Sequence, residues 1–328
     1  HFLCSNGKRI SFRVCLYKNY QDNMQEECVF GILGMSNAVF NNNKDSSRRN
    51  IYFHIPYHSI YGDDIKIVQD DSSNITLCDI MLDHLNRLDR NEFSVLKLMI
   101  KIKKFAESDV LNEENTQFDS CAEELVPSTL LLDWSLNTYP NAVDYFMFRK
   151  QFTTRLALIS VFEYVLNLLP LYPHMCNINR ESGSLFFSDI NLDTFLMQPE
   201  ECFNSDTARK VFMRLTPNLQ QLITNIGIHG PFSHTMFSAS YAIGRSTCFW
   251  PTMLKLLLKK ASSSWHENTI EKIGQVVPFI NKLSSYYSTQ FSDCGNPENG
   301  LQKISQIIDF SMNPYNILAQ DVLWYPLL

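Results

Sequence analysis

The sequence predicts an α+β fold, with strands gathered near the start of the chain and helices over most of the rest. Two β-patterned runs in residues 2–16 flank Asn6-Gly7, and Asn-Gly is the strongest short signal for a β-hairpin. Residues 143–168 carry apolar side chains at helical spacing on nearly every side, which predicts a helix buried in the core. A loop, a short hairpin and a turn containing Asp189 follow this helix. From spacing alone, the same residues could equally form the central helix of any α/β or all-α domain.

Length and composition limit the class of protein. The 328 residues are 45% hydrophobic, which is enough for one two-lobed domain or two small ones. The net charge of −6 argues against binding nucleic acid through charge alone. No apolar run reaches the roughly 18 residues of a membrane-spanning helix. The sequence starts at His1 rather than Met and shows no signal peptide, so we expect a piece of a longer polypeptide.

Nine cysteines are scattered along the chain, and none is part of a Cys-x-x-Cys pair. An odd and scattered set does not suggest a disulfide framework or a zinc site. The cysteines therefore predict reduced, mostly buried thiols in a nuclear or cytosolic protein.

Strand and helix signals alternate in the first half of the chain. The helix that begins near residue 19 should bury Phe30 and Leu33, and clusters of polar residues mark the loops. The predicted elements are a helix over 19–40, a loop over 40–50, strands over 51–58 and 65–69, a helix over 75–105, a solvated acidic linker over 107–124 and a helix from about 127.

Helices dominate the prediction for the second half. Thr216-Pro217 predicts a helix start with proline at its first position, and Gly230-Pro231 predicts the end of that helix. The predicted elements are a strand, turn and helix over 214–230, a helical pair over 232–265, an amphipathic helix over 270–291, a break over 293–297 and a helix over 301–310.

The last eight residues, 321–328, form an apolar tail that includes Trp324, Tyr325, Leu327 and Leu328. Such a tail would expose a large apolar surface if it stayed in solvent. We therefore expect it to dock in a groove on the body of the protein. The alternative is a frayed end that contacts a partner only within an assembly.

Two residue patterns resemble metal sites, but each lacks a feature that such a site needs. His54 and His58 have i,i+4 spacing, but in a strand they would lie well apart, with no further ligand at zinc spacing. Asp189, Asn191, Asp193 and Glu200 occupy positions 1, 3, 5 and 12 of a calcium loop, but Thr194 stands where the sharp turn needs glycine. We expect no bound metal.

The stretch 139–193 has the layout of a kinase catalytic core, and its residues identify the family that it resembles. Kinases related to phosphatidylinositol 3-kinase carry a helix ending in Tyr-x-Leu-Gly-Leu. A loop Gly-Asp-Arg-His-Pro-x-Asn, then Ser-Gly-Lys and Asp-Phe-Gly follow. This chain aligns with that pattern without a gap from Tyr164 to Asn191. Matching residues are Tyr164, Leu166, Leu168, Pro173, Ser182, Gly183 and Asp189.

The resemblance implies that most of the catalytic groups are replaced. Pro170 stands at the catalytic Asp, Leu171 and Tyr172 at the following Arg and His, and Met175 at the metal-binding Asn. It likewise implies Cys15 at the ATP-binding Lys and Asn23 at its acidic partner, whereas Asp189 is retained. Phosphoryl transfer needs a proton-accepting carboxylate and metal ions held by oxygen ligands. Proline, leucine and methionine supply neither, so the resemblance implies a pseudokinase without a cofactor.

Four further segments narrow the resemblance to transcription-associated pseudokinases of the TRRAP type. They are VPSTLLLDWSLNTYPNAVDYFMFRKQF, TRLALISVFEYVL, RLTPNLQQLITNIGIHGP and DVLWYPLL. The resemblance implies a two-lobed protein-kinase-like domain with a FATC-like cap. Its N-lobe would span 1–70, its C-lobe 71–296 and its cap 297–328, with Trp324, Tyr325, Leu327 and Leu328 as structural residues.

For function, the same resemblance implies a scaffold in nuclear histone acetyltransferase complexes such as SAGA. Its partners would be other subunits and, through the wider protein, transcription activators, with no direct contact with nucleic acid or membrane. Two alternatives stay open. One is a divergent active lipid or protein kinase, which would need substitutes for the groups lost at Cys15, Pro170 and Met175. The other is a cytosolic scaffold outside transcription.

Overall fold

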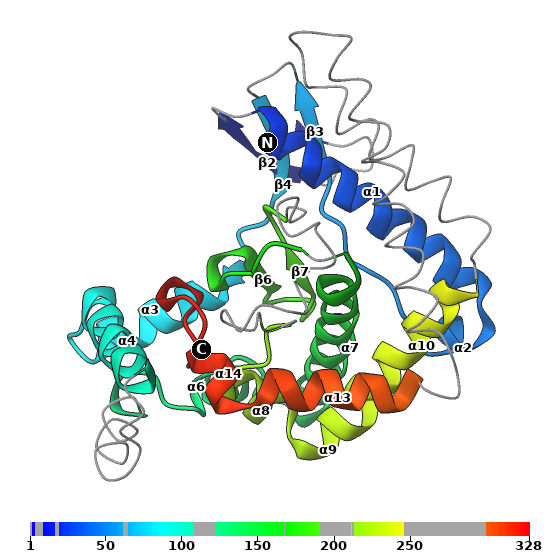
Figure 1. Ribbon diagram of the computed structural model, residues 1–328. Helices are drawn as coiled ribbons and strands as arrows, with labels where there is room; N and C mark the ends of the chain where they lie inside the picture. The colour runs from blue at the N-terminus through cyan, green and yellow to red at the C-terminus, as the bar shows by residue number, and fades with distance from the viewer. Residues whose placement is uncertain are drawn as a thin grey trace, which may run out of the picture.

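The computed structural model of the chain describes residues 2–3, 9–16, 20–61, 65–107, 123–166, 168–190, 211, 213–245 and 300–328. Figure 1 shows a small sheet and one long helix at one end of the molecule and a larger, mainly helical part at the other. We call these two parts the N-terminal lobe and the helical lobe. The predicted segments 107–124, 191–200, 246–265 and 270–297 lie wholly or largely outside the described residues.

The N-terminal lobe contains a four-stranded antiparallel sheet in the order β1-β2-β4-β3. Its strands are β1 (Phe2–Leu3), β2 (Arg9–Leu16), β3 (His58–Tyr61) and β4 (Ile65–Asp70). The antiparallel pairing of β1 with β2 confirms the hairpin predicted from Asn6-Gly7. In the register of β2 and β4, Cys15 lies directly opposite Lys66.

Helix α1 (Tyr20–Asn42) runs along this lobe and continues two residues beyond its predicted end. The loop predicted over 40–50 is wrong, because Asn43 caps the short helix α2 (Lys44–Arg48). The Asn43 side chain accepts hydrogen bonds from the backbone N–H groups of Asp45 and Ser46, which is what favours asparagine at a helix start.

The strand predicted over 51–58 is also wrong except at its last residue, where β3 begins. The backbone of Phe53 pairs with a side chain instead of a strand. Its N–H donates to the Asn37 Oδ1 (2.7 Å), and its carbonyl accepts from the Asn37 Nδ2 (3.0 Å). Asn37 thereby fixes this extended segment against α1.

The single helix predicted over 75–105 is divided by a turn. Strand β5 (Asn74–Thr76) leads into α3 (Leu77–Arg87), and Thr76 and Asp79 form a capping box at the start of α3. The chain leaves α3 through Asp89, whose φ of 53° ends the helix, and then enters α4 (Glu92–Glu107). The apolar spacing continues across the turn, so the pattern alone did not reveal it.

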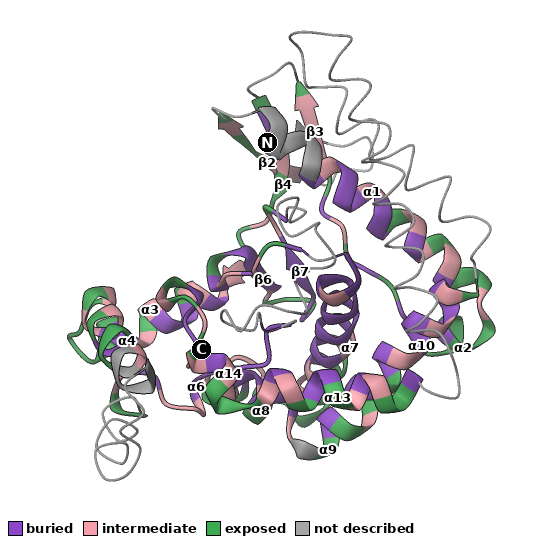
Figure 2. Cartoon of the chain, viewed as in Figure 1, coloured by how far each residue is buried: buried purple, intermediate pink, exposed green. Residues whose placement is uncertain are grey.

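Helix α7 (Ala142–Leu166) is the core of the helical lobe and confirms the predicted helix, which is buried from about Phe152 onward, whereas Val143, Phe146 and Met147 in its first turns are exposed. Figure 2 shows it buried along most of its length. In the chain, α7 follows α6 (Leu130–Thr138) and precedes the hairpin of β6 (Cys176–Asn179) and β7 (Leu185–Phe187). This hairpin and the earlier strand β5 form a three-stranded sheet of order β5-β6-β7. Gly183, in the turn of this hairpin, has φ of 67°, and a Cβ there would meet Phe148 of α7 at 3.0 Å.

The remaining helices enclose the helical lobe. They are α8 (Pro217–Ile223), α9 (Asn225–Gly227), the π-helical turn η2 (Ile228–Phe232), α10 (Ser233–Gly244), α13 (Gly300–Met312), α14 (Pro314–Leu318) and the 3₁₀ turn η3 (Val322–Trp324). The strand predicted near 214 is wrong, since residues 213–216 pair with no strand. Gly230-Pro231 does not end a helix, because the π-helical turn accommodates Pro231 and leads directly into α10.

Within the described part of the chain, no helix has both the length and the apolar character needed to cross a membrane. The four cysteines whose side chains the structure describes, Cys15, Cys28, Cys78 and Cys176, are free thiols. Cys28 and Cys176 are buried. Burial raises the pKa of the Cys78 thiol to about 11 and that of Cys176 to about 12, so both are protonated at neutral pH.

Candidate functional site

An ion network of Lys66, Glu26 and Asp189 joins the two lobes. Lys66 points inward from β4, and its side chain is only 3% exposed. It pairs with the Glu26 carboxylate of α1, which is 4% exposed, and its Nζ lies 3.5 Å from the Asp189 Oδ1 in the turn after β7. A buried ammonium needs such partners, because isolated charge in the interior is costly.

Glu26 makes the second connection between the lobes. One of its oxygens pairs with Lys66, and the other, Oε1, accepts a hydrogen bond from the Asp189 backbone N–H at 2.6 Å. Asp189 itself has φ of 57°, and its side chain remains 48% exposed. The network therefore connects α1, β4 and the Asp189 turn.

The network lies beside the residues that the resemblance implies at the ATP-binding positions. Cys15 does occupy β2, half-buried, but Lys66 on the adjacent strand supplies an ammonium group directly across from it. A carboxylate is present as well, because Glu26, which lies less than one helical turn after Asn23, pairs with Lys66. Asn23 lies in α1, and its side chain is outside the described residues.

Glu26 gives the stability of the chain a defined dependence on pH. Burial raises the pKa of Glu26 above its ordinary value of 4.5, and Lys66 opposes this shift only in part. A carboxyl with a raised pKa in the folded state contributes stability that is full below about 4.5 and is lost as pH rises through the folded pKa. We therefore expect the difference in unfolding free energy, wild type minus Glu26→Gln, to fall as the pH rises from about 4.5 through the folded-state pKa of Glu26. Urea melts of both proteins at a series of pH values measure it; a difference that grows with pH would contradict the assignment.

The loop after α7 contains the residues that the resemblance implies at the catalytic positions. Leu171 is fully buried and Met175 is 6% exposed, so both side chains belong to the hydrophobic core. Pro170 is partly buried. The 3₁₀ turn η1 (Pro173–Met175) closes the loop, and the Met175 carbonyl accepts hydrogen bonds from the Ser188 N–H (3.0 Å) and the Asn177 Nδ2 (2.9 Å).

Tyr172, which the resemblance implies at the catalytic-loop His, contacts the C-terminal part of the chain. It packs against a small apolar cluster of Val211, Ile317 and Trp324. Its ring also stacks on His174 with centroids 5.7 Å apart. Burial raises the pKa of the Tyr172 hydroxyl, and the Asp321 carboxylate acts in the same direction, so this group is not a base at neutral pH.

The two metal-like patterns do not assemble a site in the described residues. His54 and His58 contact different aromatic rings, Phe186 at 5.3 Å and Phe30 at 4.6 Å between centroids. Asp189 pairs with Lys66, and the other three positions of the calcium-like pattern lie outside the described residues. No group of three His, Cys, Asp or Glu side chains in the described part of the chain is arranged to hold a metal ion.

Arg214 fastens the C-terminal tail to the helical lobe. Its guanidinium is 1% exposed and donates to the backbone carbonyls of Trp324 (2.6 Å), Tyr325 (3.2 Å) and Leu328 (2.5 Å). It also lies over the Trp324 ring, 4.6 Å from the centroid. Burial lowers the pKa of Arg214 to about 10, which still leaves it charged at neutral pH. The carbonyl oxygens of the tail thus solvate a buried charge.

The tail residues named from the sequence contact Arg214 or residues close to it. Trp324, Tyr325 and Leu328 are 3%, 5% and 0% exposed. The Leu327 carbonyl accepts from the Asn218 Nδ2 at 2.7 Å, and the Tyr325 hydroxyl donates to the Glu92 carboxylate of α4. In the structure this segment is therefore seated on α4, α8 and the residues just before α8.

Both the sequence and the fold of this chain match those of known proteins. The sequence profile described as phosphatidylinositol 3- and 4-kinase matches residues 14–267, well over half of the chain. The chain belongs to this kinase family. Among solved structures, the Tel1 kinase butterfly symmetric dimer superposes with a TM-score of 0.71 at 15% identity, over 97% of this chain and 13% of that chain. The FAT and kinase domain of CtTel1 gives 0.68 at 12% identity, over 99% and 22%. The predicted kinase-like α+β fold is confirmed.

Sequence relatives narrow the position within the kinase family. The transformation/transcription domain-associated protein of Homo sapiens is 26% identical over 98% of this chain and 9% of its own length. The SAGA complex/NuA4 acetyltransferase complex subunit TRA1 of Saccharomyces cerevisiae is 23% identical, again over 98% and 9%. The resemblance to TRRAP-type proteins is confirmed. The kinase-like chain spans less than a tenth of each of these relatives.

Sequence reasoning missed three important residues of this kinase-like chain. Lys66 carried a signal, since it is a lone charge between the apolar Ile65 and Ile67 of a predicted strand. Glu26 could also have been noticed, because it lies four residues before Phe30 on the same face of a helix, and Phe30 is predicted to be buried. Arg214 gave no signal of its own, because its partners lie more than a hundred positions away.

Proposed function

We propose that the chain is the catalytically inactive kinase-like module of a large scaffold subunit in nuclear histone acetyltransferase complexes of the SAGA type. In this role it presents surface to neighbouring subunits and supports transcription coactivation without transferring phosphate. The observation that carries the proposal is the loop of residues 170–175. Leu171 and Met175 pack into the core, Tyr172 packs onto the tail cluster, and none of the six residues is a carboxylate.

Chemistry supports the inactive assignment. A kinase loop supplies a carboxylate that accepts the hydroxyl proton and an amide oxygen that holds a metal ion. Pro170 has no group that can accept a proton, and the Met175 thioether is a poor ligand for magnesium. Leu171 and Tyr172 instead contribute apolar contacts, with Tyr172 against the tail cluster. The loop therefore contributes apolar contacts between the helical lobe and the C-terminal segment.

The names of the relatives support the wider setting. One relative is named as a subunit of the SAGA and NuA4 acetyltransferase complexes, and another as transcription-associated. By this proposal, the partners are other subunits of such complexes, transcription activators bind elsewhere in the longer protein, and neither nucleic acid nor membrane contacts the chain directly. We assign residues 1–70 to the N-lobe, 71–296 to the C-lobe and 297–328 to a FATC-like cap.

A divergent active lipid or protein kinase is the second candidate, and one observation favours it. Lys66, Glu26 and Asp189 supply the ammonium, its acidic partner and one carboxylate, so the group expected at Cys15 has a substitute. Within the described residues, the loop offers no replacement at Pro170 or Met175. Two of the three required groups are still lacking.

The inactive assignment predicts no response to nucleotide. ATP with magnesium should leave the melting temperature of the chain unchanged, because the loop offers no metal ligand at Met175 and no carboxylate at Pro170. A ligand at a hundred times its dissociation constant would stabilise the fold by about 2.7 kcal/mol. For a domain of this size that is a shift of several degrees. Thermal melts with and without ATP and magnesium measure the difference.

The control for this melt is Lys66→Met, in which any phosphate contact through the ammonium is removed. A clear ATP-dependent rise in the wild type that Lys66→Met abolishes would favour the active kinase. The third reading, a cytosolic scaffold outside transcription, predicts different companions. Purifying the full-length protein and identifying the bound subunits separates it from the nuclear assignment.

A further inference from the structure

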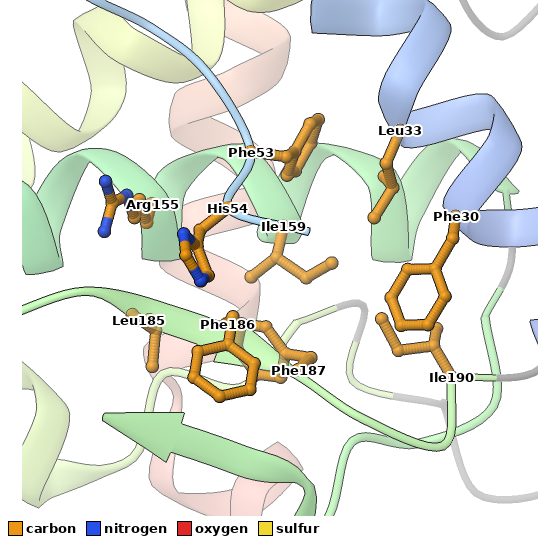
Figure 3. A pocket seen from close by; sticks show the side chains of 10 residues that line it. All are labelled: Phe30, Leu33, Phe53, His54, Arg155, Ile159, Leu185, Phe186, Phe187 and Ile190. Carbon is orange, nitrogen blue, oxygen red and sulfur yellow. The ribbon is translucent and has the colours of Figure 1, made fainter. Parts of the chain in front are cut away.

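The cavity between α1, α7 and β7 is too small for a ligand (Figure 3). Its volume is about 10 Å³, close to the minimum for one water molecule. Phe30, Ile159 and Phe187 line it from these three elements, and most of the other lining side chains are apolar too. This part of the core therefore has no room for a partner, whereas the surface of α4 offers one a contact.

Helix α4 carries apolar side chains on two faces. Val95, Leu98 and Met99 are buried and face the rest of the helical lobe. Phe93 and Ile100 are 61% and 45% exposed. Because these two residues are seven positions apart, they lie on the same side of the helix, two turns from each other. A single exposed apolar side chain is normal, but an exposed row on a helix whose other face is already buried points to a contact surface.

Two lysines lie along the same row. Lys97 and Lys101 are exposed and follow Phe93 after about one and two helical turns. The Lys97 Nζ lies 4.4 Å from the centre of the Phe93 ring, which places the charge directly beside the exposed aromatic side chain. We call Phe93, Lys97, Ile100 and Lys101 the α4 stripe. It combines large apolar groups with positive charge on one face.

The α4 stripe belongs to a basic stretch of an acidic chain. Residues 87–104 contain six lysines and arginines and only two carboxylates, whereas the net charge of the whole chain is −6. One of the two carboxylates, Glu92, accepts the hydrogen bond of the Tyr325 hydroxyl. The ion pairs of the described residues lie at the junction of the lobes and include none of these six cations. The stretch therefore presents a positive field to its surroundings.

Helix α4 is held in place from its buried side. The tail elements α14 and η3 pack against it, and the bond between Glu92 and Tyr325 ties its first turn to the tail. Figure 1 shows α4 at the outer end of the helical lobe, away from the sheet of the N-terminal lobe. A fixed helix with an open face is preorganised for binding, because little order has to be gained when a partner arrives.

We propose that the α4 stripe binds a short acidic segment of a protein partner, in which Asp or Glu alternates with large apolar residues. The carboxylates pair with Lys97 and Lys101, and the apolar side chains cover Phe93 and Ile100. Exposed ion pairs alone contribute little, so the apolar contacts supply affinity and the charges supply selectivity. This surface does not depend on whether the kinase-like loop is active.

A protein segment fits the α4 stripe better than a nucleic acid does. The phosphates of a nucleic acid form a long, continuous run of negative charge. Such a run would extend from the short basic stretch over a chain whose net charge is negative, where it is repelled. A short peptide carries its few charges only where the lysines are, and its apolar residues cover the exposed Phe93 and Ile100.

Fluorescence anisotropy with a labelled synthetic peptide, in which Glu alternates with Leu and Phe, tests the proposal on the chain of residues 1–328. The double variant Lys97→Glu with Lys101→Glu should weaken binding about tenfold, because it replaces two exposed ion pairs by repulsion. Phe93→Ser with Ile100→Ser should weaken it by about the same factor through lost apolar contact. Added salt should weaken binding to the wild type. All four positions are lysines or apolar residues on the surface, so thermal melts should show the variants folded.

The matched control is Phe146→Ser with Lys150→Glu on α7. Phe146 is 64% exposed and Lys150 is an exposed lysine four positions later, so this pair repeats the spacing of Phe93 and Lys97. It lies beside the exposed Asp144 and outside the basic stretch. This control variant should bind the peptide as the wild type does.

Three results would overturn the proposal. The first is equal affinity of the peptide for the wild type and for Lys97→Glu with Lys101→Glu. The second is equal affinity of the wild type for a peptide with Gln in place of every Glu, since the charges would then play no part. The third is a thymidine oligonucleotide, or a vesicle containing phosphatidylserine, that binds more tightly than the peptide and loses its binding in the same lysine variant. That result would assign the α4 stripe to a nucleic acid or a membrane instead.

Discussion

Lys66→Met should lower the free energy of unfolding by about 3–5 kcal/mol, the usual cost of removing one partner of a buried ion pair. The substitution leaves the Glu26 carboxylate 4% exposed without its cation. It also removes the only ammonium that faces Asp189 among the described residues. Denaturant unfolding of the wild type and of the variant measures the loss.

Two controls separate the ion pair from other effects of the substitution. The double variant Lys66→Met with Glu26→Gln removes both charges, and most of the lost stability should return because no buried charge is left alone. Lys101→Met changes an exposed lysine of α4 and should stay within about 0.5 kcal/mol of the wild type. If the single and the double variant are equally unstable, the network does not carry the stability assigned to it.

Trp324→Ala should cost about 3–5 kcal/mol, the range for truncating a buried aromatic side chain. Trp324 is 3% exposed, lies against the Arg214 guanidinium and packs with Val211 and Ile317. Its loss leaves a buried charge without the ring above it. Deleting residues 321–328 should be at least as harmful, since Arg214 would lose three carbonyl partners. A denaturant or thermal melt measures both changes.

The matched control is the neighbouring residue Leu323, which is 54% exposed. Leu323→Ala should change the unfolding free energy by less than about 0.5 kcal/mol. A Trp324→Ala variant that melts where Leu323→Ala melts would show that the tail contributes nothing to the stability of the chain. The remaining reading would be a tail whose apolar residues serve only a partner in the assembly.

The sequence predicted elements well where one residue pattern persists. Helix α7 begins and ends within two residues of its predicted bounds, because its apolar residues continue without glycine or proline. The predictions failed where a single residue interrupts a continuing pattern. Asp89 ends α3 by taking a left-handed conformation, and the side chain of Asn37 occupies the backbone groups of a predicted strand.

The candidate site was harder to predict than the fold, for a physical reason. Replacing the Lys position by Cys15 predicts loss of the ammonium only if no adjacent strand supplies another. Strand register is a property of the assembled sheet, and it places Lys66 opposite Cys15. The apolar tail was evident from composition, but its anchor at Arg214 depends on a contact between segments far apart in the chain. Residue patterns report local structure, whereas both of these groups are defined by tertiary contacts.

Phosphotransfer by the intact assembly tests the central claim most directly. The full-length protein would be purified with its companion subunits and incubated with magnesium and ATP labelled on the γ-phosphate. Asp189→Ala, which removes the carboxylate that the resemblance implies at the Asp-Phe-Gly position, is the matched variant. The inactive assignment predicts the same background incorporation for both proteins and the same set of bound subunits. Incorporation in the wild type that Asp189→Ala abolishes would contradict it and identify the chain as a working kinase.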